Sequence, residues 1–242
     1  MTDLGDRVAV LVPAWNEVRN VTHTVSEIRA ADPLYDVIVI DDGSTDGTSG
    51  AAKAAGAEVL ILPFNLGVGG AMRTGFTFAA RRGYNRVIQV DADGQHNPEH
   101  IRLVLGGLER ADICIGARFA DVGDYMVRGP RRWAMVFLAT LVSRVAKVRL
   151  TDVTSGFRAA NRRAIEQYVR YYPAEYLGDT LDSLVEALHA GLTVTQVPVA
   201  MRPRMHGKPS QNVWGSTVYL VRSVFAISLA LMRGALRRRP SA

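Results

Sequence analysis

Two carboxylates, Asp91 and Asp93, follow the apolar run 87–90 and are separated only by Ala92. Carboxylate oxygens bind hard divalent ions such as Mg²⁺ and Mn²⁺, usually together with substrate phosphates. In open α/β sheets, ligands bind beyond the carboxyl ends of the strands. The spacing therefore predicts a metal-assisted diphosphate site at a strand end. The alternative is a loop whose aspartates only turn the chain and cap the next helix.

Two further apolar runs, at 8–12 and 36–40, also end in polar loops, at 13–17 and 41–48. A helical stretch follows each of the three loops, which is the pattern of a parallel sheet buried on both faces. We expect the polar loops to meet at one edge of that sheet. The strands of the first half are predicted at 7–12, 36–41, 57–62, 86–91 and 111–116.

Six short motifs between residues 7 and 210 resemble those of a known family. The segments 13–17 (PAWNE), 41–46 (DDGSTD) and 91–96 (DADGQH) resemble the successive signatures of family 2 glycosyltransferases with the GT-A fold. The segments 116–119 (GARF), 155–158 (SGFR) and 204–207 (RMHG) resemble those of the polyprenyl- and dolichyl-phosphate sugar synthases within that family. The resemblance implies an α/β fold with a Rossmann-like, mostly parallel sheet flanked by helices.

The resemblance also implies roles for individual residues. Asp91 and Asp93 would hold Mg²⁺ or Mn²⁺, with Gln95 as a further oxygen ligand. The nucleotide sugar would contact Pro13, Ala14, Asn16, Glu17, Asp42, Asp91, Ala92 and Asp93, and the acceptor phosphate would contact Arg118, Arg131, Ser155, Arg204 and Lys208.

Several of these residues have a structural alternative. Asn16 and Glu17 could instead begin the next helix, and Asp46 and Thr48 are expected to be turn and cap residues. His96 either supports the metal ligands or has no special role, and the role of Glu186, on a helix predicted at 180–190, stays open.

The acceptor decides which catalytic groups the reaction needs. A sugar hydroxyl requires a carboxylate to remove its proton. A phosphate monoester has a second pKa near 6 and is mostly dianionic at neutral pH, so it is already a nucleophile. Arginines suit such an acceptor, because their fork geometry matches phosphate oxygens. On this basis we predict that Arg118 and Arg204 act in catalysis together with Asp91 and Asp93.

Composition narrows the class of protein. The chain has 242 residues, 48% of them hydrophobic and 21% charged, which is typical of a globular domain. Its one cysteine, Cys114, lies in an apolar run and permits no disulfide within the chain. The first six residues lack the pattern of a secretory signal, so a cytoplasmic location is expected.

The formal charge of +6 arises from basic residues concentrated after position 117. Such a surplus suits an anionic membrane or an anionic substrate. Nucleic acid is not an expected partner, because no nucleic-acid-binding motif is visible and aromatic content is 7%.

Two apolar segments with basic flanks, at 133–142 and 213–236, suit interfacial helices on an anionic membrane surface. Neither is a predicted transmembrane span, because Arg222 and Arg233 leave only ten residues between them in the second. The alternatives are core packing for the first segment and subunit contact for the second. We expect one GT-A domain, with a nucleotide-sugar half at 1–125, an acceptor half at 126–212 and an amphipathic basic helix at 213–242.

The leading hypothesis is inverting transfer of a sugar from a GDP- or UDP-linked donor to a polyprenyl phosphate, by a peripheral protein on the cytoplasmic face of the membrane. A separate small membrane protein could anchor it there. One rival is a GT-A transferase acting on a glycan hydroxyl or a protein, and another is a non-catalytic nucleotide-sugar-binding or docking subunit. The sequence leaves open the sugar, the nucleotide, the polyprenyl length, the metal and the oligomeric state.

Overall fold

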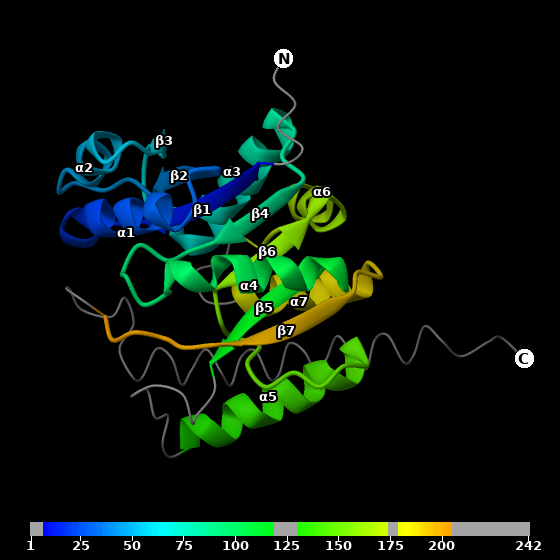
Figure 1. Cartoon of the computed structure of the whole chain (residues 1–242). Coiled ribbons are helices and arrows are strands. Elements are labelled where there is room, and N and C mark those ends of the chain that lie inside the picture. Colours follow the sequence, from blue (N-terminus) through cyan, green and yellow to red (C-terminus); the bar gives the residue numbers. More distant parts are fainter. Residues whose placement is uncertain (1–6, 119–129, 174–178, 205–242) are drawn as a thin grey trace, which may run out of the picture.

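The computed structural model describes residues 7–118, 130–173 and 179–204, and within them the chain forms an α/β fold (Figure 1). Seven strands make one sheet in the order β3-β2-β1-β4-β6-β5-β7. Their bounds are β1 Val8–Ala14, β2 Tyr35–Asp41, β3 Glu58–Ile61, β4 Arg86–Gln89, β5 Ile113–Arg118, β6 Arg158–Asn161 and β7 Val194–Val199. The five strands predicted for the first half are all present, whereas β6 and β7 were not predicted.

Helices connect the strands and cover both faces of the sheet. They are α1 Val18–Ala31, α2 Thr48–Ala54, α3 Gly67–Arg82, α4 Ile101–Gly106, α5 Pro130–Ala146, α6 Arg162–Arg170 and α7 Asp179–His189, with short 3-10 turns at Pro98–His100 (η1) and Gly107–Glu109 (η2). The helix predicted at 180–190 is confirmed as α7.

Side chains of β1 alternate between two hydrophobic clusters. Ala9 and Leu11 pack with α3, α5, α6 and α7, while Val10 and Val12 pack with α1, α2 and α4. In Figure 1, α1 and α4 lie in front of the sheet. Burial on both faces explains why the strands of the first half read as continuous apolar runs and not as alternating ones.

Strand β6 runs antiparallel to both of its neighbours, β4 and β5, while every other pairing among the described strands is parallel. Because of this reversal, β6 starts at the edge where β4 and β5 end. The turn before β6, residues 152–157, is thereby brought beside the acidic loop that follows β4. Four residues with two alanines give too short a pattern to predict such a strand.

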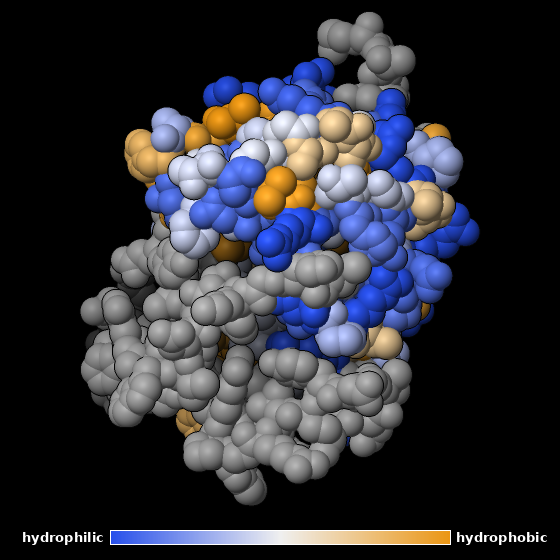
Figure 2. All heavy atoms as spheres, turned by 90° about the vertical axis from the view of Figure 1, so that its left-hand side faces the viewer, coloured by the Kyte–Doolittle hydropathy of each residue, from blue (hydrophilic) through white to orange (hydrophobic). Residues whose placement is uncertain are grey.

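Helix α5 confirms part of the core-packing alternative for the segment 133–142. Leu138, Ala139 and Val142 are buried in the core, while Val136 and Phe137 are about half exposed. In the described part of the chain, no helix is long and apolar enough to cross a membrane. Figure 2 shows the face that is on the left in Figure 1, where the coloured apolar groups are separated by hydrophilic ones. The segment 213–242, with its predicted amphipathic helix, lies outside the described residues.

Candidate functional site

The acidic loop directly follows β4 and is held by hydrogen bonds at each carboxylate. Gln89 Nε2 donates to Asp91 Oδ1 at 3.0 Å, and the Gln95 amide donates to Asp93 Oδ1 at 3.0 Å. The Asp91 side chain is 38% exposed and that of Asp93 only 9%. One carboxylate therefore opens to solvent at the sheet edge, while the other lies largely inside.

His96 stabilises the acidic loop through contacts of its imidazole ring. Its ring is buried and stacks on Phe157, with centroids 4.8 Å apart. The Asp91 amide donates to His96 Nδ1 at 3.0 Å, so we assign the proton to Nε2, which lies 3.6 Å from Asp91 Oδ2. Of the two sequence-based alternatives, the structure thus favours a supporting role at Asp91.

Gly156, in the turn before β6, also lies close to the Asp91 side chain. A Cβ built at this position would lie 2.9 Å from Gln89 Nε2 and 3.3 Å from each carboxylate oxygen of Asp91. Any larger residue here would displace the ends of these two side chains. Backbone from the predicted acceptor half therefore forms one wall of the acidic site.

Arg204 reaches the acidic loop from the segment that follows β7. Its Nη2 lies 2.9 Å from Asp93 Oδ2, and its Nη1 lies 3.4 Å from Glu17 Oε1. Glu17 directly precedes α1 and is partly buried, and burial raises the pKa of its carboxyl group despite the hydrogen bond from Asn20 and the Arg204 charge. The structure thus places Arg204 at the predicted metal site, where its role toward an acceptor phosphate stays a prediction.

Arg118 ends β5 and forms a two-pronged ion pair with Asp152. Its Nε and Nη2 lie 2.7 and 3.3 Å from the two Asp152 oxygens, and Nη2 also donates to Thr154 Oγ1 at 3.1 Å. Burial alone would raise the pKa of Asp152. The Arg118 charge and the hydrogen bonds from Arg118 and Thr154 outweigh it and hold that pKa below its ordinary value. Any phosphate held by Arg118 would therefore share it with a buried carboxylate.

Of the other predicted acceptor residues, the structure describes the side chain of Ser155 but not those of Arg131 and Lys208. Ser155 is buried in the turn before β6, where its hydroxyl accepts the Phe157 amide at 3.3 Å. Arg131 lies in the first turn of α5, but its side chain is outside the described part of the structure. Lys208 also lies outside the described residues.

On the nucleotide side, Asp42 has a clear structural task. Its two carboxylate oxygens accept the amides of Leu66 and Gly67, at 2.7 and 2.8 Å, where α3 begins. Burial raises the pKa of Asp42, although these two bonds oppose the shift. Asp42 thus holds the start of α3 against β2, and its contact with a nucleotide stays a prediction.

The loop after β1 is fixed against the loop after β2. Asn16 has a positive φ of 54° and its side-chain oxygen accepts the Thr45 amide at 3.0 Å. Asp46 accepts the amides of Thr48 and Val18, at 3.0 and 3.2 Å, where α2 and α1 begin. The predicted turn role of Asp46 is confirmed, and its carboxylate accepts the first amide of both helices, although the N-cap residues themselves are Gly47 and Glu17. Pro13 and Ala14 lie at the end of β1, and the Ala14 carbonyl accepts the Asp42 amide at 2.9 Å.

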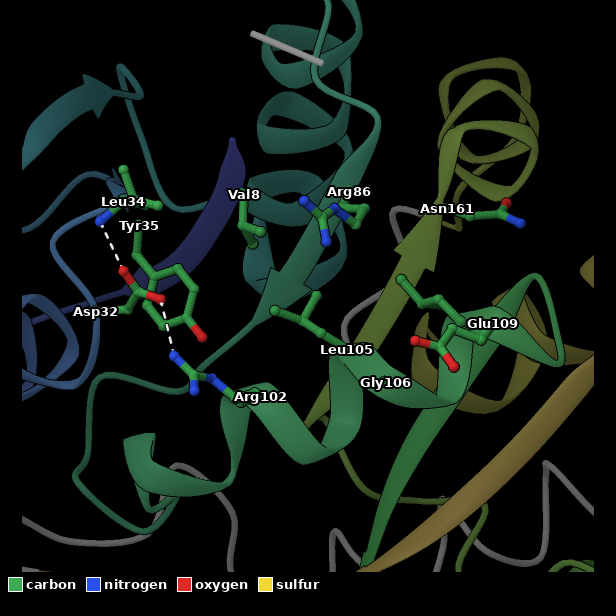
Figure 3. Close-up of a pocket in the computed structure, with 11 residues that line it drawn as sticks. Val8, Asp32, Leu34, Tyr35, Arg86, Arg102, Leu105, Gly106, Glu109 and Asn161 are labelled. Atoms are coloured by element: carbon green, nitrogen blue, oxygen red, sulfur yellow. Dashed lines mark hydrogen bonds and ion pairs between the residues drawn. The ribbon is translucent and has the colours of Figure 1, made fainter. Parts of the chain in front are cut away.

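A pocket of about 440 Å³ lies at the opposite edge of the sheet (Figure 3). Val8, Tyr35 and Arg86 line it at the starts of β1, β2 and β4, whereas the acidic loop follows the end of β4. In it, Arg102 pairs with Asp32 at 3.5 Å. This pocket is therefore distinct from the candidate site, because it lies at the starts of the strands and the site lies at their ends.

The acidic loop fits a divalent ion completed by substrate oxygens. Across the described ranges, no group of three or more His, Cys, Asp or Glu side chains is arranged to enclose a metal. Mg²⁺ is commonly held by one or two carboxylates together with phosphates and water. Asp91 and Asp93 supply such carboxylates, and the open exposure of Asp91 leaves room for a phosphate partner.

Sequence reasoning missed Gln89 as part of the site, and it missed the proximity of Gly156 to Asp91 and the ion pair of Asp152 with Arg118. Gln89 is the one polar residue in the run 87–90, which was a usable signal. Gly156 and Asp152 belong to a turn whose distance from the acidic loop depends on β6. Without that strand, nothing in the local sequence connects them to Asp91 and Arg118.

Comparison with known proteins agrees with this geometry. Residues 9–169 match glycosyl transferase family 2. The chain is 33% identical over 224 residues to the undecaprenyl-phosphate mannosyltransferase of Micrococcus luteus, covering 88% of this chain and 91% of that protein. It is 29% identical over 241 residues to the polyprenol monophosphomannose synthase of Mycolicibacterium smegmatis, covering 96% of this chain and 89% of that one.

Among solved structures, the chain resembles glucosyl-3-phosphoglycerate synthase from Mycobacterium tuberculosis, solved with Mn²⁺, UDP and glucosyl-3-phosphoglycerate. The TM-score is 0.68 at 23% identity, over 94% of this chain and 80% of that one. At that identity the likeness establishes the shared GT-A architecture.

Proposed function

This chain belongs to glycosyl transferase family 2, and we propose that it transfers a sugar from a nucleoside-diphosphate donor to a polyprenyl phosphate, with inversion at the anomeric carbon. The observation that carries the proposal is the meeting of the acidic loop, the turn before β6 and Arg204 at one sheet edge. One of the two relatives compared above is named for undecaprenyl phosphate and the other for polyprenol monophosphomannose, and both names specify mannose. Mannose is therefore the first sugar to test.

On the donor side, Asp91 and Asp93 would hold Mg²⁺ or Mn²⁺ with the donor diphosphate, with Gln95 as a further ligand. The ion would offset the negative charge that builds up on the leaving nucleoside diphosphate. Gln89 and His96 orient Asp91 for this task through the hydrogen bonds described above. The structural relative was solved with Mn²⁺ and UDP, which supports a divalent ion as part of this proposal.

On the acceptor side, an oxygen of the phosphate dianion attacks the anomeric carbon, and the bond from that carbon to the donor diphosphate breaks. The products are a sugar phosphodiester and a free nucleoside diphosphate. No proton has to leave the nucleophile, so no general base is required. Arg118 and Arg204 would align the phosphate, with Arg131, Ser155 and Lys208 as further predicted contacts. Because Arg204 lies 2.9 Å from Asp93, it would also contact the donor diphosphate.

A polyprenyl acceptor lies in a membrane, so the enzyme has to work at its surface. The exposed Val136 and Phe137 of α5 and the basic segment 213–242 are the predicted contacts. A small membrane protein could supply further anchoring. We place the protein on the cytoplasmic face as part of the proposal.

The test is a screen of GDP- and UDP-linked sugars against a short polyprenyl phosphate with Mn²⁺ or Mg²⁺, with product mass as the readout. The expected product is a sugar phosphodiester that mild acid cleaves. Equal transfer to a polyprenyl alcohol, a free glycan or a peptide would favour the hydroxyl-acceptor rival. Donor binding without transfer to any acceptor would favour a non-catalytic subunit.

A further inference from the structure

The four residues Met201–Arg204, here called the strap, cross the acidic loop after β7 ends. Met201 forms an antiparallel bridge with His96, the residue that supports Asp91. The Arg202 amide donates to the Gln95 carbonyl at 2.9 Å. The strap is thus attached by its backbone to the loop that carries both predicted metal ligands.

The Arg202 side chain ties the strap to two further elements. Its Nη1 lies 2.7 and 3.0 Å from the two carboxylate oxygens of Glu27, in the middle of α1. Its Nη2 donates to Asn97 Oδ1 at 2.7 Å, and Asn97 also caps η1 by accepting the Glu99 amide. Arg202 therefore joins α1, the end of the acidic loop and the strap in one network.

The second arginine of the strap, Arg204, also contacts both the acidic loop and the region of α1, at positions closer to the predicted metal ligands. Its partners are Asp93 in the acidic loop and Glu17 at the start of α1. Residues two apart on an extended chain face the same side. Pro203 between them fixes its own φ and favours extended backbone at Arg202. The geometry of Arg202 therefore sets where Arg204 can reach.

We propose that Arg202, locked by Glu27 and Asn97, is a positioning residue that holds Arg204 on the acidic loop for the donor diphosphate. Arg202 contacts neither Asp91 nor Asp93, so its effect on the reaction passes through Arg204. The inference rests on the proposed function, because it assumes that Arg204 and the acidic loop receive the donor.

The anchor itself is tested without turnover, by hydrogen exchange of fragments that cover residues 199–204. Glu27→Gln removes the charge that holds Arg202 and changes nothing in the strap. We expect the Arg202 amide to exchange about three- to tenfold faster, the range for a partly exposed, charge-assisted contact. The matched control is Arg82→Gln, which removes a 3.0 Å ion pair to Glu58 distant from the site and should leave strap exchange unchanged. Unchanged exchange in Glu27→Gln overturns the anchor.

The link to Arg204 is tested by calorimetric binding of UDP and GDP in the presence of Mn²⁺. Arg202→Gln and Glu27→Gln should each weaken binding of the preferred nucleotide about three- to tenfold, and the swapped pair Glu27→Arg with Arg202→Glu should restore part of it. In an Arg204→Ala background, Arg202→Gln should have almost no further effect, because both changes act through one side chain. Additive losses would mean that Arg202 has only a structural role. If Arg204→Ala alone leaves both affinities intact while strap exchange responds to Glu27→Gln, the anchor exists and the assumed donor role of Arg204 fails.

Discussion

Replacing Arg118 with alanine should show how much this side chain contributes to the stability of the fold and how much to the reaction. The substitution leaves Asp152, 3% exposed, with hydrogen bonds from Thr154 and a 3.4 Å bond from the backbone amide of residue 118 as its remaining described contacts. Removing one partner of a buried pair costs about 3–5 kcal/mol. Because the Arg118 side chain is itself 26% exposed, we expect a smaller loss, about 2–3 kcal/mol. For a chain of this size that corresponds to a fall in Tm of about 5–10 °C.

The pH dependence of this loss follows from the pKa of Asp152. In the native protein this pKa is lowered, so the contribution of Asp152 to stability is present above the ordinary aspartate pKa and is lost as pH falls through the folded value. Without Arg118, burial dominates and the pKa should rise above the ordinary value. The variant should then lose stability as pH rises through that raised pKa. Its deficit relative to the native protein should be largest near neutral pH and should shrink below about pH 4.5.

Thermal unfolding at about pH 3.5 and about pH 7.5 measures this effect. The double variant Arg118→Ala with Asp152→Asn should recover most of the lost Tm at neutral pH, since no buried charge remains. Arg118→Lys keeps a charge near Asp152 and should preserve stability, but it removes the fork that suits a phosphate. A fall in Tm of less than about 2 °C at neutral pH, or a loss that is the same at both pH values, would refute the buried-pair reasoning. Full transfer activity in Arg118→Lys would count against a two-pronged phosphate contact.

Three further outcomes are expected. Asp91→Asn and Asp93→Asn should each abolish transfer while Tm stays within a few degrees, and a chelator should do the same reversibly; full activity in excess chelator would exclude the metal role. Gly156→Ala should lower kcat/KM at least about tenfold, because its Cβ would displace Asp91 or Gln89, whereas Gly50→Ala, where a Cβ meets nothing within 4 Å, should be neutral. Removing residues 213–242 should reduce flotation with anionic liposomes at low salt, since each basic residue near such a surface contributes about 1 kcal/mol; flotation equal to that of the full chain would contradict the membrane role of this segment.

The donor half was predictable from the sequence because its signals are local. Each strand from β1 to β5 contains a short continuous apolar run, and the polar loops after β1, β2 and β4 carry residues whose chemistry can be interpreted one by one. The sequence could not predict which groups those residues contact in the folded chain. Asp42 accepts hydrogen bonds from the amides at the start of α3, and Arg204 forms ion pairs with Asp93 and Glu17. These contacts join residues up to 187 positions apart, and nothing in local composition encodes them.

The second half was harder because its strands are short and irregularly buried. In β7, residues 195–198 are partly or fully exposed between buried ends, so neither an alternating nor a continuous apolar pattern appears. Only the resemblance of short motifs indicated that Arg118, Ser155 and Arg204 belong near one another. The structure explains why: β6 brings the turn before it to the edge where β5 ends.

The placement of β6 also has a consequence for how the chain folds during synthesis. Strands β2, β3 and β4 each pair with a strand made earlier, so the first part of the sheet can assemble as it leaves the ribosome. Strand β5 has no partner among them, because β6 lies between β5 and β4. About 40 further residues must be synthesised before β6 begins, and until then β5 is an apolar segment without a partner strand. We expect the interval between β5 and β6 to be the step at which newly made chains are most prone to aggregate.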